Sequence, residues 1–456
     1  MTNRKTAVVM LAAGLGTRMK SELPKVLHPL ANRPMIAHLL DTVAALAPER
    51  VVVVIGEDMD AVAKTVAPHP IVVQHPRLGT GHAVMAARAA LADFDGDVLI
   101  VYGDTPLITQ ATLERMLAAR RAATNPAVIV LGFRPADPGA YGRLIVGPDG
   151  SLDAIVEAND ATPEQHAIGL CNSGVMAVDG ARLFALLDRV GNANAKGEYY
   201  LTDIVHLARG DGIACGFVEG GARELLGVNS RADLAAAEAI VQDGLRSRAM
   251  AEGASLVDPR TVWFSWDTTL GRDVTIGPSV VFGPGVRIGN NVKVLGFCHF
   301  EGARVEDGAV IGPFARLRPG AVIGADAHVG NFVEIKNAVI ERGAKANHLS
   351  YIGDARVGAK ANIGAGTITC NYDGFFKSHT DIGAGAFIGS NTCLVAPVTI
   401  GDGAIIGAGS AIAKNVPGDA LAVTRGPFIV REKWARDFRE RRGAEKIAAS
   451  KAKQES

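Results

Sequence analysis

Two glycines and two basic residues near the N-terminus form a pattern that could bind a phosphate. Gly14 and Gly16 follow the apolar run 7–11, and Arg18 and Lys25 come soon after them. Glycines let backbone N–H groups approach phosphate oxygens closely, and basic side chains add positive charge beside them. A dinucleotide fingerprint would need a third glycine at Met19, and a Walker loop would need Gly-Lys-Ser or Gly-Lys-Thr. A plain tight turn after a strand is the remaining alternative.

The longer string Leu11-Ala12-Ala13-Gly14-Leu15-Gly16-Thr17-Arg18-Met19, followed by Pro24-Lys25, resembles the signature of sugar-nucleotide pyrophosphorylases. In that family the glycine-rich loop, the arginine and the lysine hold a nucleoside triphosphate. The resemblance implies that residues 11–14 bind the nucleotide. It also implies that Arg18 and Lys25 stabilise the charge that moves during transfer.

A carboxylate follows another apolar run at Tyr102-Gly103-Asp104. Open α/β sheets place their ligands at the carboxyl ends of their strands. A carboxylate there suits Mg²⁺, which neutralises triphosphate charge during transfer. Alone, an aspartate after a strand is more often a helix cap. Behind the first motif, we expect Asp104 to be a metal ligand.

The first half of the chain is similar more narrowly to uridylyltransferases of amino-sugar metabolism. That resemblance implies a uracil pocket, a sugar pocket and a second Mg²⁺ ligand. The uracil residues would be Gln74, Gly79 and Thr80, the sugar residues Gly142, Glu157 and Asn172, and the metal ligand beside Asp104 would be Asn229. Tyr102 and Gly103 would complete the substrate-binding residues.

A second set of polar residues lies in the C-terminal half, within a six-residue repeat. Arg318 and Lys336 occupy matching repeat positions where glycine is common, and His348 and Tyr351 follow. Two basic side chains at matching positions could bind an anion such as a sugar phosphate. His348 could take a proton from an amine, because imidazole titrates in the required range. A structural or surface role is the commoner one for a lone histidine.

The repeat predicts the element that positions these residues. Apolar residues recur every six positions from Ile276 to Ile412, often followed by glycine. This period fits a three-sided parallel β-helix, with glycine at the corners for positive φ. A β-sandwich would space its strands 8–12 residues apart. The register breaks between Thr369 and Ile382, which predicts a loop of residues 370–380 standing out from the wall.

The N-terminal half predicts a different architecture. Apolar runs at 7–11, 51–55, 71–73 and 98–102 alternate with segments of helical spacing. Buried strands that alternate with helices favour a parallel sheet covered on both faces. The predicted organisation is a Rossmann-like α/β nucleotidyltransferase domain, a helical linker and a β-helix domain with a charged tail. Their predicted bounds are 1–230, 231–250 and 251–456, with the tail at 431–456.

Residues 316–372 closely resemble the acetyltransferase half of a bacterial bifunctional family, and the match continues over essentially the full chain to Pro427. Members acetylate glucosamine 1-phosphate and uridylylate N-acetylglucosamine 1-phosphate. The resemblance implies a left-handed β-helix, a homotrimer with shared acetyltransferase sites, and His348 as catalytic base. The implied glucosamine phosphate residues are Arg318, Lys336, Tyr351 and Asn362. Those for acetyl-CoA are Ala365, Ser390, Ala408 and Arg425, and Asn371 and Tyr372 lie beside both ligands.

By this resemblance the β-helix uses acetyl-CoA first, and the N-terminal domain then uses UTP with Mg²⁺. One alternative is a single-activity sugar nucleotidyltransferase whose β-helix is structural or regulatory. Another is a β-helix that only docks a partner. Both leave His348, Lys336 and Arg318 unexplained.

Composition limits which partners and which cellular location we expect. The chain has 47 basic and 47 acidic residues, which gives no argument for a nucleic-acid or membrane partner. Its five cysteines are odd in number and show no C-x-x-C spacing, so neither a disulfide framework nor a zinc site is expected. The apolar stretch near the N-terminus is too short for a signal peptide. We expect a cytoplasmic protein acting on small-molecule substrates.

Overall fold

The computed structural model describes residues 4–452 and separates into two compact units. Among the described residues, the first unit comprises residues 4–272 and Ile276–Arg287, and the second comprises Asp273–Thr275 and residues 288–452. The segment predicted as a linker helix is α8 (Arg231–Ala251), which begins at Ser230 with a capping box closed by Asp233. The predicted domain bounds at 230 and 250 stay predictions.

The first unit is built on a mixed sheet. Its main strands, in spatial order, are β11 (Cys215–Glu219), β7 (Val128–Phe133), β10 (Cys171–Asp179), β6 (Asp97–Tyr102), β1 (Thr6–Leu11), β4 (Arg50–Gly56) and β5 (Ile71–Gln74). The four strands expected from the apolar runs are parallel, as predicted. The sheet also contains β10, which was not among the predicted strands and runs antiparallel to β6 and β7.

The reversal at β10 follows from the segment before it. Between β7 and β10 the chain forms the antiparallel hairpin of β8 (Arg143–Val146) and β9 (Leu152–Val156), and then only the short helix α5 (Pro163–His166). A parallel connection usually contains a full crossover helix, which this segment lacks. The chain therefore returns along the opposite direction.

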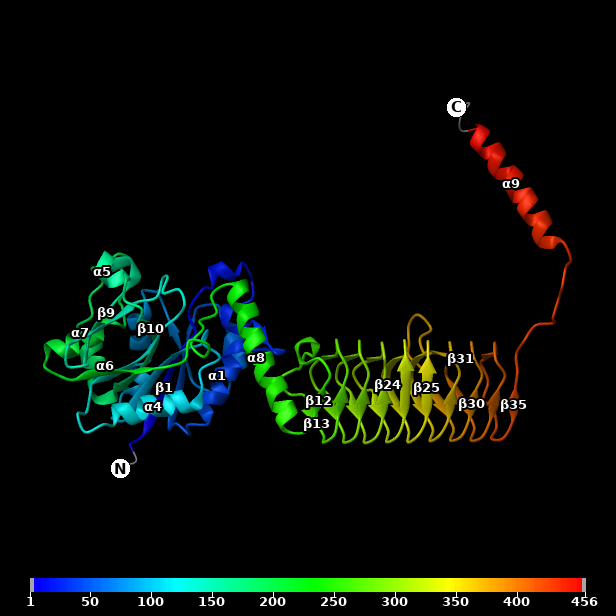
Figure 1. Ribbon diagram of the computed structural model, residues 1–456, viewed down its shortest axis with the longest axis horizontal. Helices are drawn as coiled ribbons and strands as arrows, with labels where there is room; N and C mark the ends of the chain where they lie inside the picture. Colours follow the sequence, from blue (N-terminus) through cyan, green and yellow to red (C-terminus); the bar gives the residue numbers. More distant parts are fainter. Residues whose placement is uncertain (1–3, 453–456) are drawn as a thin grey trace. The chain divides into compact units, whose positions relative to one another are not determined.

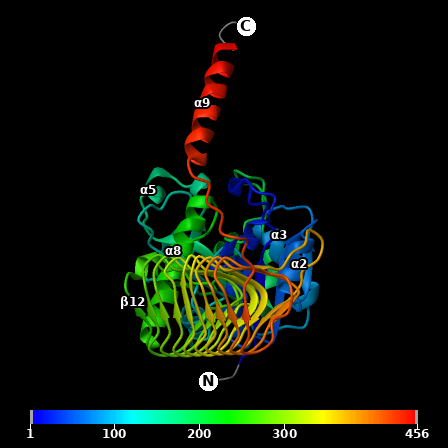
Figure 2. The same ribbon diagram turned by 90° about the vertical axis from the view of Figure 1, so that its right-hand side faces the viewer.

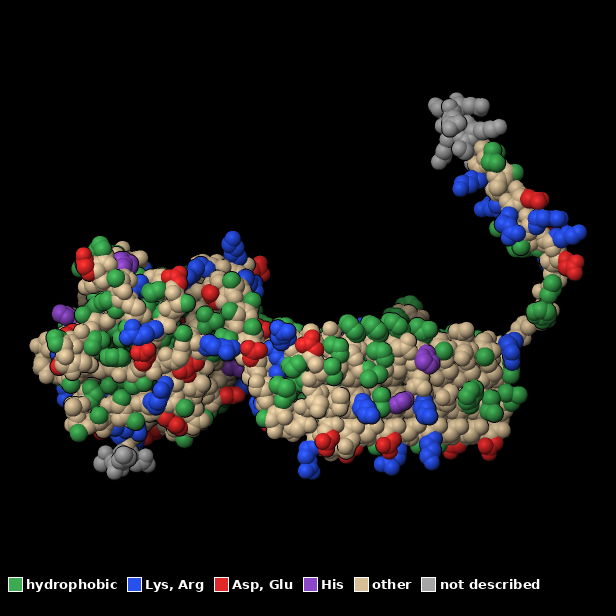
Figure 3. Space-filling view, viewed as in Figure 1, with side chains coloured by type: hydrophobic (Ala, Val, Ile, Leu, Met, Phe, Trp, Pro, Cys, Tyr) green, Lys and Arg blue, Asp and Glu red, His purple; other side chains and the backbone are tan. Residues whose placement is uncertain are grey.

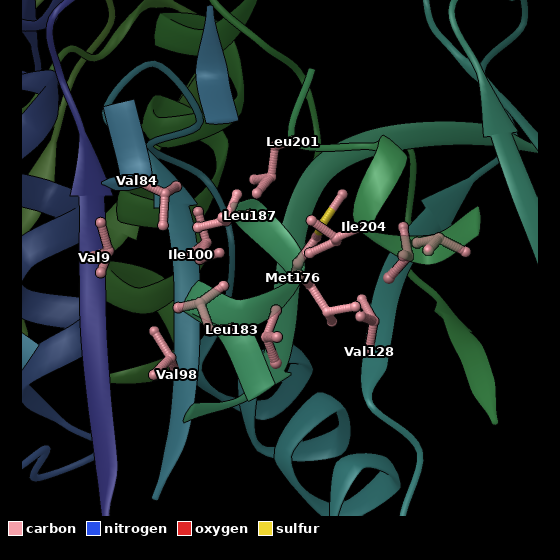
Figure 4. Packing of buried hydrophobic residues seen from close by; sticks show 14 of the residues in the cluster. Val9, Val84, Val98, Ile100, Val128, Met176, Leu183, Leu187, Leu201 and Ile204 are labelled. Atoms are coloured by element: carbon pink, nitrogen blue, oxygen red, sulfur yellow. The ribbon is translucent and has the colours of Figure 1, made fainter. Parts of the chain in front are cut away.

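Helices cover both faces of this sheet. Alternate residues of β1 divide between two hydrophobic cores, with Val9 in one and Met10 in the other. The first core also takes residues from α3 (Thr80–Ala86), α6 (Gly180–Leu187) and α7 (Asp203–Gly210), and Figure 4 shows Val84, Leu183 and Ile204 packed there. The second core takes residues from α1 (Met35–Ala44), α2 (Asp60–Val66) and α4 (Gln110–Arg120). This layering confirms the Rossmann-like α/β prediction.

The second unit is a parallel β-helix whose coils stack one behind the next (Figures 1 and 2). Val310 pairs with His328, and Arg316 pairs with Glu334, so one coil takes three six-residue repeats. The inward side chains Ile311, Leu317 and Ile323 are completely buried. The predicted hexapeptide architecture is confirmed, and the left-handed sense stays a prediction.

Its short strands fall on three walls. The first wall contains β17 (Lys293–Val294), β20 (Val310–Ile311), β23 (His328–Asn331), β25 (Lys345–His348), β27 (Asn362–Ile363), β30 (Phe387–Ile388), β33 (Ile405–Ile406) and β35 (Leu421–Ala422). The other two walls contain β18 (His299–Phe300), β19 (Arg304–Val305), β21 (Arg316–Leu317), β22 (Val322–Ile323), β24 (Glu334–Ile340), β26 (Tyr351–Val357), β28 (Ile368–Cys370), β29 (Thr380–Ile382), β31 (Cys393–Val395), β32 (Val398–Ile400) and β34 (Ala411–Ile412).

The glycines of the repeat do not all have the expected role, which was to adopt positive φ at the corners. A Cβ atom on Gly364 would lie 2.6 Å from both the Ile388 carbonyl oxygen and the Ser390 nitrogen, although its φ is not positive. This glycine therefore allows close approach of the next coil. Positive φ occurs elsewhere, at Gly366 and at side-chain-bearing residues such as Phe314 (φ 58°). The expectation that glycines after the inward residue supply positive φ is wrong at Gly364.

The charged tail contains helix α9 (Trp434–Ala452), in which the Trp434 and Phe438 rings stack with centroids 5.2 Å apart. Within residues 4–452, every helix is too short or too polar to span a lipid bilayer. The cytoplasmic location stays a prediction.

Candidate active sites

The glycine-rich loop and Asp104 meet at the carboxyl edge of the first sheet. Strands β1 and β6 are paired in register, with Leu11 opposite Tyr102. The Gly103 N–H donates to the Leu11 carbonyl at 2.9 Å, which fixes the two strand ends against each other. The two motifs predicted from separate segments are therefore adjacent in space.

A cavity of about 290 Å³ opens at this edge. The predicted residues that line it are Leu11, Ala12, Ala13, Gly14, Lys25, Gln74, Gly79, Thr80, Tyr102 and Asp104. Arg18 does not line it, because this exposed side chain lies on the single 3₁₀ turn Thr17–Met19 beyond the loop. Gly103 packs beneath the cavity instead, close to Val26.

Lys25, Asp104 and Asn229 form the polar centre of the cavity region. The Lys25 ammonium forms an ion pair with Asp104 and donates to Asn229 Oδ1 at 3.1 Å. One carboxylate oxygen and one amide oxygen thus converge on a single cationic group. This donor set also suits a hard divalent cation such as Mg²⁺.

Gly16 determines where Lys25 lies. Gly16 has φ 62°, and a Cβ atom added to it would stand 2.6 Å from Lys25 Cβ. In contrast, a Cβ on Gly14 would meet nothing within 4 Å. The second glycine of the motif is required for packing of the lysine, whereas the first faces open space on the cavity side.

The predicted uracil residues form one corner of the cavity. Gln74 Nε2 donates to the Gly79 carbonyl at 2.9 Å, and Thr80 begins α3 directly afterwards. Four lining residues were missed by the sequence reasoning, Val26, Arg77, Ala83 and Glu198. Arg77 Nε donates to the Ala13 carbonyl at 2.7 Å. This hydrogen bond connects residues 74–80 to the glycine-rich loop. Arg77 lies between Gln74 and Gly79 in the sequence, and this position could have identified it as a candidate.

The predicted sugar residues Gly142, Glu157 and Asn172 also come together. The Asn172 N–H donates to the Gly142 carbonyl at 2.8 Å, and β8 and β9 pair Arg143 with Val156, next to Glu157. Thr202, which the sequence reasoning missed, donates its hydroxyl to Glu157 Oε1 at 3.2 Å. Burial raises the pKa of Glu157, and the Thr202 hydrogen bond opposes that rise.

Tyr102 connects the sugar residues with the metal-ligand candidates. Burial raises the pKa of Tyr102 well above its ordinary value, and the Glu157 and Asp104 carboxylates add to the rise. The phenol therefore remains protonated. Glu157 itself borders a separate cavity of about 370 Å³ with Asp160 and Asp203.

In the β-helix, Arg318 and Lys336 lie in one column of successive coils. The Arg318 N–H donates to the Ile335 carbonyl at 2.8 Å, and Lys336 pairs with Gly353 on the next coil. The Tyr351 hydroxyl lies over Gly353, so its ring extends along β26 toward this column. The structure thus brings Arg318, Lys336 and Tyr351 together.

The inserted loop adds a third cation to this column. The Lys377 side chain contacts that of Lys336, and this contact, the Lys377 charge and the Arg318 charge all lower the pKa of Lys336. The loop is anchored by Asn371, whose amide donates to Asp354, and it closes with a bridge between Tyr372 and Lys377. Lys377 was missed, although it is the basic residue within the predicted loop.

His348 lies at the end of β25, on the neighbouring corner of the coil. Its Nδ1 is 2.7 Å from Oδ1 of Asn331, the residue with which it pairs on the preceding coil. The imidazole is exposed, and Nδ1 is the ring nitrogen that faces Asn331. Sequence reasoning missed Asn331, which only the coil register identifies.

The residues predicted to contact acetyl-CoA lie on successive coils at positions aligned with His348. Ile363, Ile388 and Ile406 are aligned on successive coils, so Ala365, Ser390 and Ala408, two residues later in each case, also align. Ala346 pairs with Ile363, which places His348 in line with Ala365. The Arg425 guanidinium lies near Gly407 at the far end, 3.2 Å from where a Cβ would stand. Asn362 lies on the same wall, paired with Lys345.

Comparison with known proteins identifies the family of both units. Residues 8–166 match the model of the MobA-like NTP transferase domain, and residues 267–301, 302–337 and 379–414 match bacterial transferase hexapeptide repeats. The Bifunctional protein GlmU of Paramagnetospirillum magneticum is 67% identical over 98% of this chain and 99% of its own length. The protein of that name from Rhodospirillum rubrum is 71% identical over 95% and 97%. That from Zymomonas mobilis is 51% identical over 96% and 98%. The chain therefore belongs to the GlmU family of bifunctional transferases.

Proposed function

We propose that this chain carries out two consecutive reactions of UDP-N-acetylglucosamine synthesis. The β-helix acetylates glucosamine 1-phosphate with acetyl-CoA, and the α/β unit transfers uridylyl from UTP to N-acetylglucosamine 1-phosphate, releasing pyrophosphate. The observation that carries the proposal is the presence of two polar clusters, one in each unit. Lys25, Asp104 and Asn229 form the first, and His348, Lys336 and Arg318 belong to the second.

In uridylyl transfer, the phosphate oxygen of the sugar phosphate attacks the α-phosphorus of UTP. The chain needs no nucleophile of its own, because positioning and charge stabilisation carry this type of transfer. Lys25 is placed to stabilise negative charge on the phosphates, and we assign Arg18 the same role from outside the cavity wall. Asp104 and Asn229 would hold Mg²⁺, which supplies neutralisation of the triphosphate charge when bound.

In acetyl transfer, His348 removes a proton from the sugar amine, which attacks the thioester carbonyl while CoA leaves as the thiol. Because Nδ1 faces the Asn331 amide oxygen at 2.7 Å, Nδ1 carries the proton and Nε2 is the basic nitrogen. Backbone N–H groups would hold the tetrahedral oxyanion. Arg318, Lys336 and Lys377 neutralise the sugar phosphate.

Acetyl-CoA is proposed to follow the corner occupied by Ala365, Ser390 and Ala408. These small side chains leave room along three aligned coils, and Arg425 at the end offers positive charge for the CoA phosphates. By the family resemblance, Asn371 and Tyr372 of the inserted loop are proposed to contact acetyl-CoA as well.

We further propose a homotrimer in which neighbouring subunits complete each acetyltransferase site. Hydrophobic side chains are exposed along the β-helix (Figure 3). They include Phe297, Phe314 and Phe332, whose rings stack with centroids 4.9 Å and 5.0 Å apart. Exposed apolar patches on protein surfaces mark interaction sites.

The proposal is tested by separating the two reactions. His348→Ala should abolish acetyl transfer and leave uridylyl transfer intact, and Asp104→Ala should give the converse result. If the unmodified protein shows uridylyl transfer, which Asp104→Ala abolishes, but no acetyl transfer, the chain is instead a single-activity nucleotidyltransferase. Unchanged acetyl transfer in His348→Ala would exclude this histidine as the base.

A further inference from the structure

One carboxylate at a corner of the β-helix accepts hydrogen bonds from two amides on neighbouring coils. The strand register places Asn337, Asp354 and Asn371 at the same position on three successive coils. Asn337 Nδ2 donates to Asp354 Oδ1 at 2.6 Å, and Asn371 Nδ2 donates to Asp354 Oδ2. Each carboxylate oxygen therefore accepts from one amide. Asn337 and Asp354 have φ of 44° and 48°, a conformation that Asn and Asp adopt more readily than most residues.

The carboxylate determines which atom of the Asn371 amide is left for a ligand. An ionised carboxylate only accepts hydrogen bonds, so Nδ2 of Asn371 must face Asp354. Within residues 4–452, Asn371 Oδ1 has no hydrogen-bond donor, so it remains available as an acceptor. Burial acts to raise the pKa of Asp354, but the two amide hydrogen bonds and the charges of Lys377 and Lys336 together lower it below its ordinary value. Asp354 is therefore ionised at neutral pH.

The same hydrogen bond attaches the inserted loop to the wall of the β-helix. The Ser378 N–H donates to the Asn371 carbonyl at 2.9 Å, and Tyr372 and Lys377 form an antiparallel bridge, so the loop closes on itself. Asn371 lies at the base of this closed loop, and its side chain is bonded to Asp354 on the preceding coil. The position of Lys377 therefore depends on that bond.

We propose that Asp354 is a positioning residue for acetyl transfer, a role that rests on the proposed function. Both of its oxygens are engaged by amides, so it acts through Asn371 and the loop that contains Lys377, and not on a reacting atom. Loss of this anchor should raise KM for acetyl-CoA and for glucosamine 1-phosphate. The value of kcat should change less, because the His348–Asn331 pair lies on the neighbouring corner of the coil.

Three variants separate this role from effects of the backbone and of charge. Asp354→Gly removes both acceptor oxygens at a positive φ, where glycine is unstrained. The matched control Asn337→Gly makes the same kind of change one coil earlier and leaves the bond between Asn371 and Asp354 in place. In Asp354→Asn the new amide oxygen can accept from Asn371, while its nitrogen donates to a reoriented Asn337. The anchor should therefore be retained without the charge.

Hydrogen exchange over residues 371–379 of the full chain measures the anchor directly. The Ser378 N–H should exchange roughly tenfold faster in Asp354→Gly, because local opening of the loop no longer breaks a charge-assisted hydrogen bond. Asn337→Gly and Asp354→Asn should exchange at the rate of the unmodified protein. An unchanged rate in Asp354→Gly would overturn the role, and so would an equal rise in Asp354→Asn.

Steady-state kinetics then test the consequence for acetyl transfer. Asp354→Gly should raise KM for acetyl-CoA about tenfold, whereas Asn337→Gly and Asp354→Asn should keep the unmodified value. Uridylyl transfer is the internal control in all three variants. Equal KM values in Asp354→Gly and Asn337→Gly would contradict positioning by Asp354. An unmodified protein without acetyl transfer would contradict the proposed function instead, and hydrogen exchange would still decide whether Asp354 anchors the loop.

Discussion

The imidazole of His348 and the amide of Asn331 are partners across two coils of the β-helix, with Nδ1 and Oδ1 2.7 Å apart. The amide oxygen accepts from Nδ1–H, which fixes the tautomer and the ring orientation. The proposed base is therefore positioned by a residue from the previous coil. Several consequences of such long-range contacts can be measured.

Asn331→Ala should lower kcat of acetyl transfer about 10- to 100-fold, the equivalent of ~1.5–3 kcal/mol for a hydrogen bond that stabilises a developing charge. The substrate contacts made by other residues remain, so KM for glucosamine 1-phosphate should change little. Steady-state kinetics of both reactions would check this. Uridylyl transfer serves as the internal control, and an unchanged kcat would rule out positioning by Asn331.

Features that depend on residues close together in the sequence could be predicted, whereas contacts between residues far apart in the sequence could not. The hexapeptide period is local, so the β-helix and its inserted loop were predicted from neighbouring residues. The contact of Lys25 with Asn229 joins residues 204 positions apart. No spacing rule brings such residues together, and family resemblance alone paired Asn229 with Asp104.

The missed residues have the same explanation. Asn331 is identified only by the register of β23 and β25, and Thr202 only by its contact with Glu157 from α7's N-terminal end. The direction of β10 was not predictable from its apolar composition, because buried parallel and antiparallel strands can look alike. Arg18 belongs to a recognisable motif, yet it lies on the 3₁₀ turn and does not line the cavity.

Lys377→Met should raise KM for glucosamine 1-phosphate about tenfold, since one charge-assisted contact to the phosphate is lost. It should also alter the alkaline side of the pH profile. Lys377 lowers the pKa of Lys336, so its removal raises that pKa and keeps Lys336 charged to higher pH. The alkaline limb of kcat/KM should move upward in the variant. A limb at the same pH in both proteins would contradict the coupling.

Gly16→Ala should abolish most uridylyl transfer while leaving acetyl transfer unchanged. The added Cβ would stand 2.6 Å from Lys25 Cβ and displace the lysine from Asp104. Backbone strain at positive φ costs ~1–2 kcal/mol by itself. Gly150→Ala is the matched control, because Gly150 has φ 80° and nothing within 4 Å of an added Cβ. Equal loss of activity in both variants would show that strain, and not Lys25, is responsible.

Chelation by EDTA should stop uridylyl transfer and spare acetyl transfer, if Asp104 and Asn229 hold Mg²⁺. Asn229→Ala should then raise the Mg²⁺ concentration needed for half-maximal uridylyl transfer, and added Mg²⁺ should restore much of the rate. The measurement is a Mg²⁺ titration at fixed UTP. An unchanged requirement in the variant would remove Asn229 from the metal site.

Thr202→Val tests how Glu157 is kept ionised in the sugar pocket. Burial raises the pKa of Glu157, and the Thr202 hydroxyl, which donates at 3.2 Å, lowers it. Without that hydroxyl the pKa rises further, so the carboxylate is present only from a higher pH upward. The acidic limb of kcat/KM for N-acetylglucosamine 1-phosphate should therefore move to higher pH.

The same variant should show a higher KM for the sugar phosphate and an unchanged KM for UTP, because Thr202 does not line the cavity that contains Gln74 and Gly79. Valine has nearly the shape of threonine, so packing at this buried position is retained. Thr202→Ser keeps the hydroxyl and should restore the acidic limb. If Thr202→Ser and Thr202→Val shift the limb equally, the methyl group and not the hydrogen bond controls Glu157.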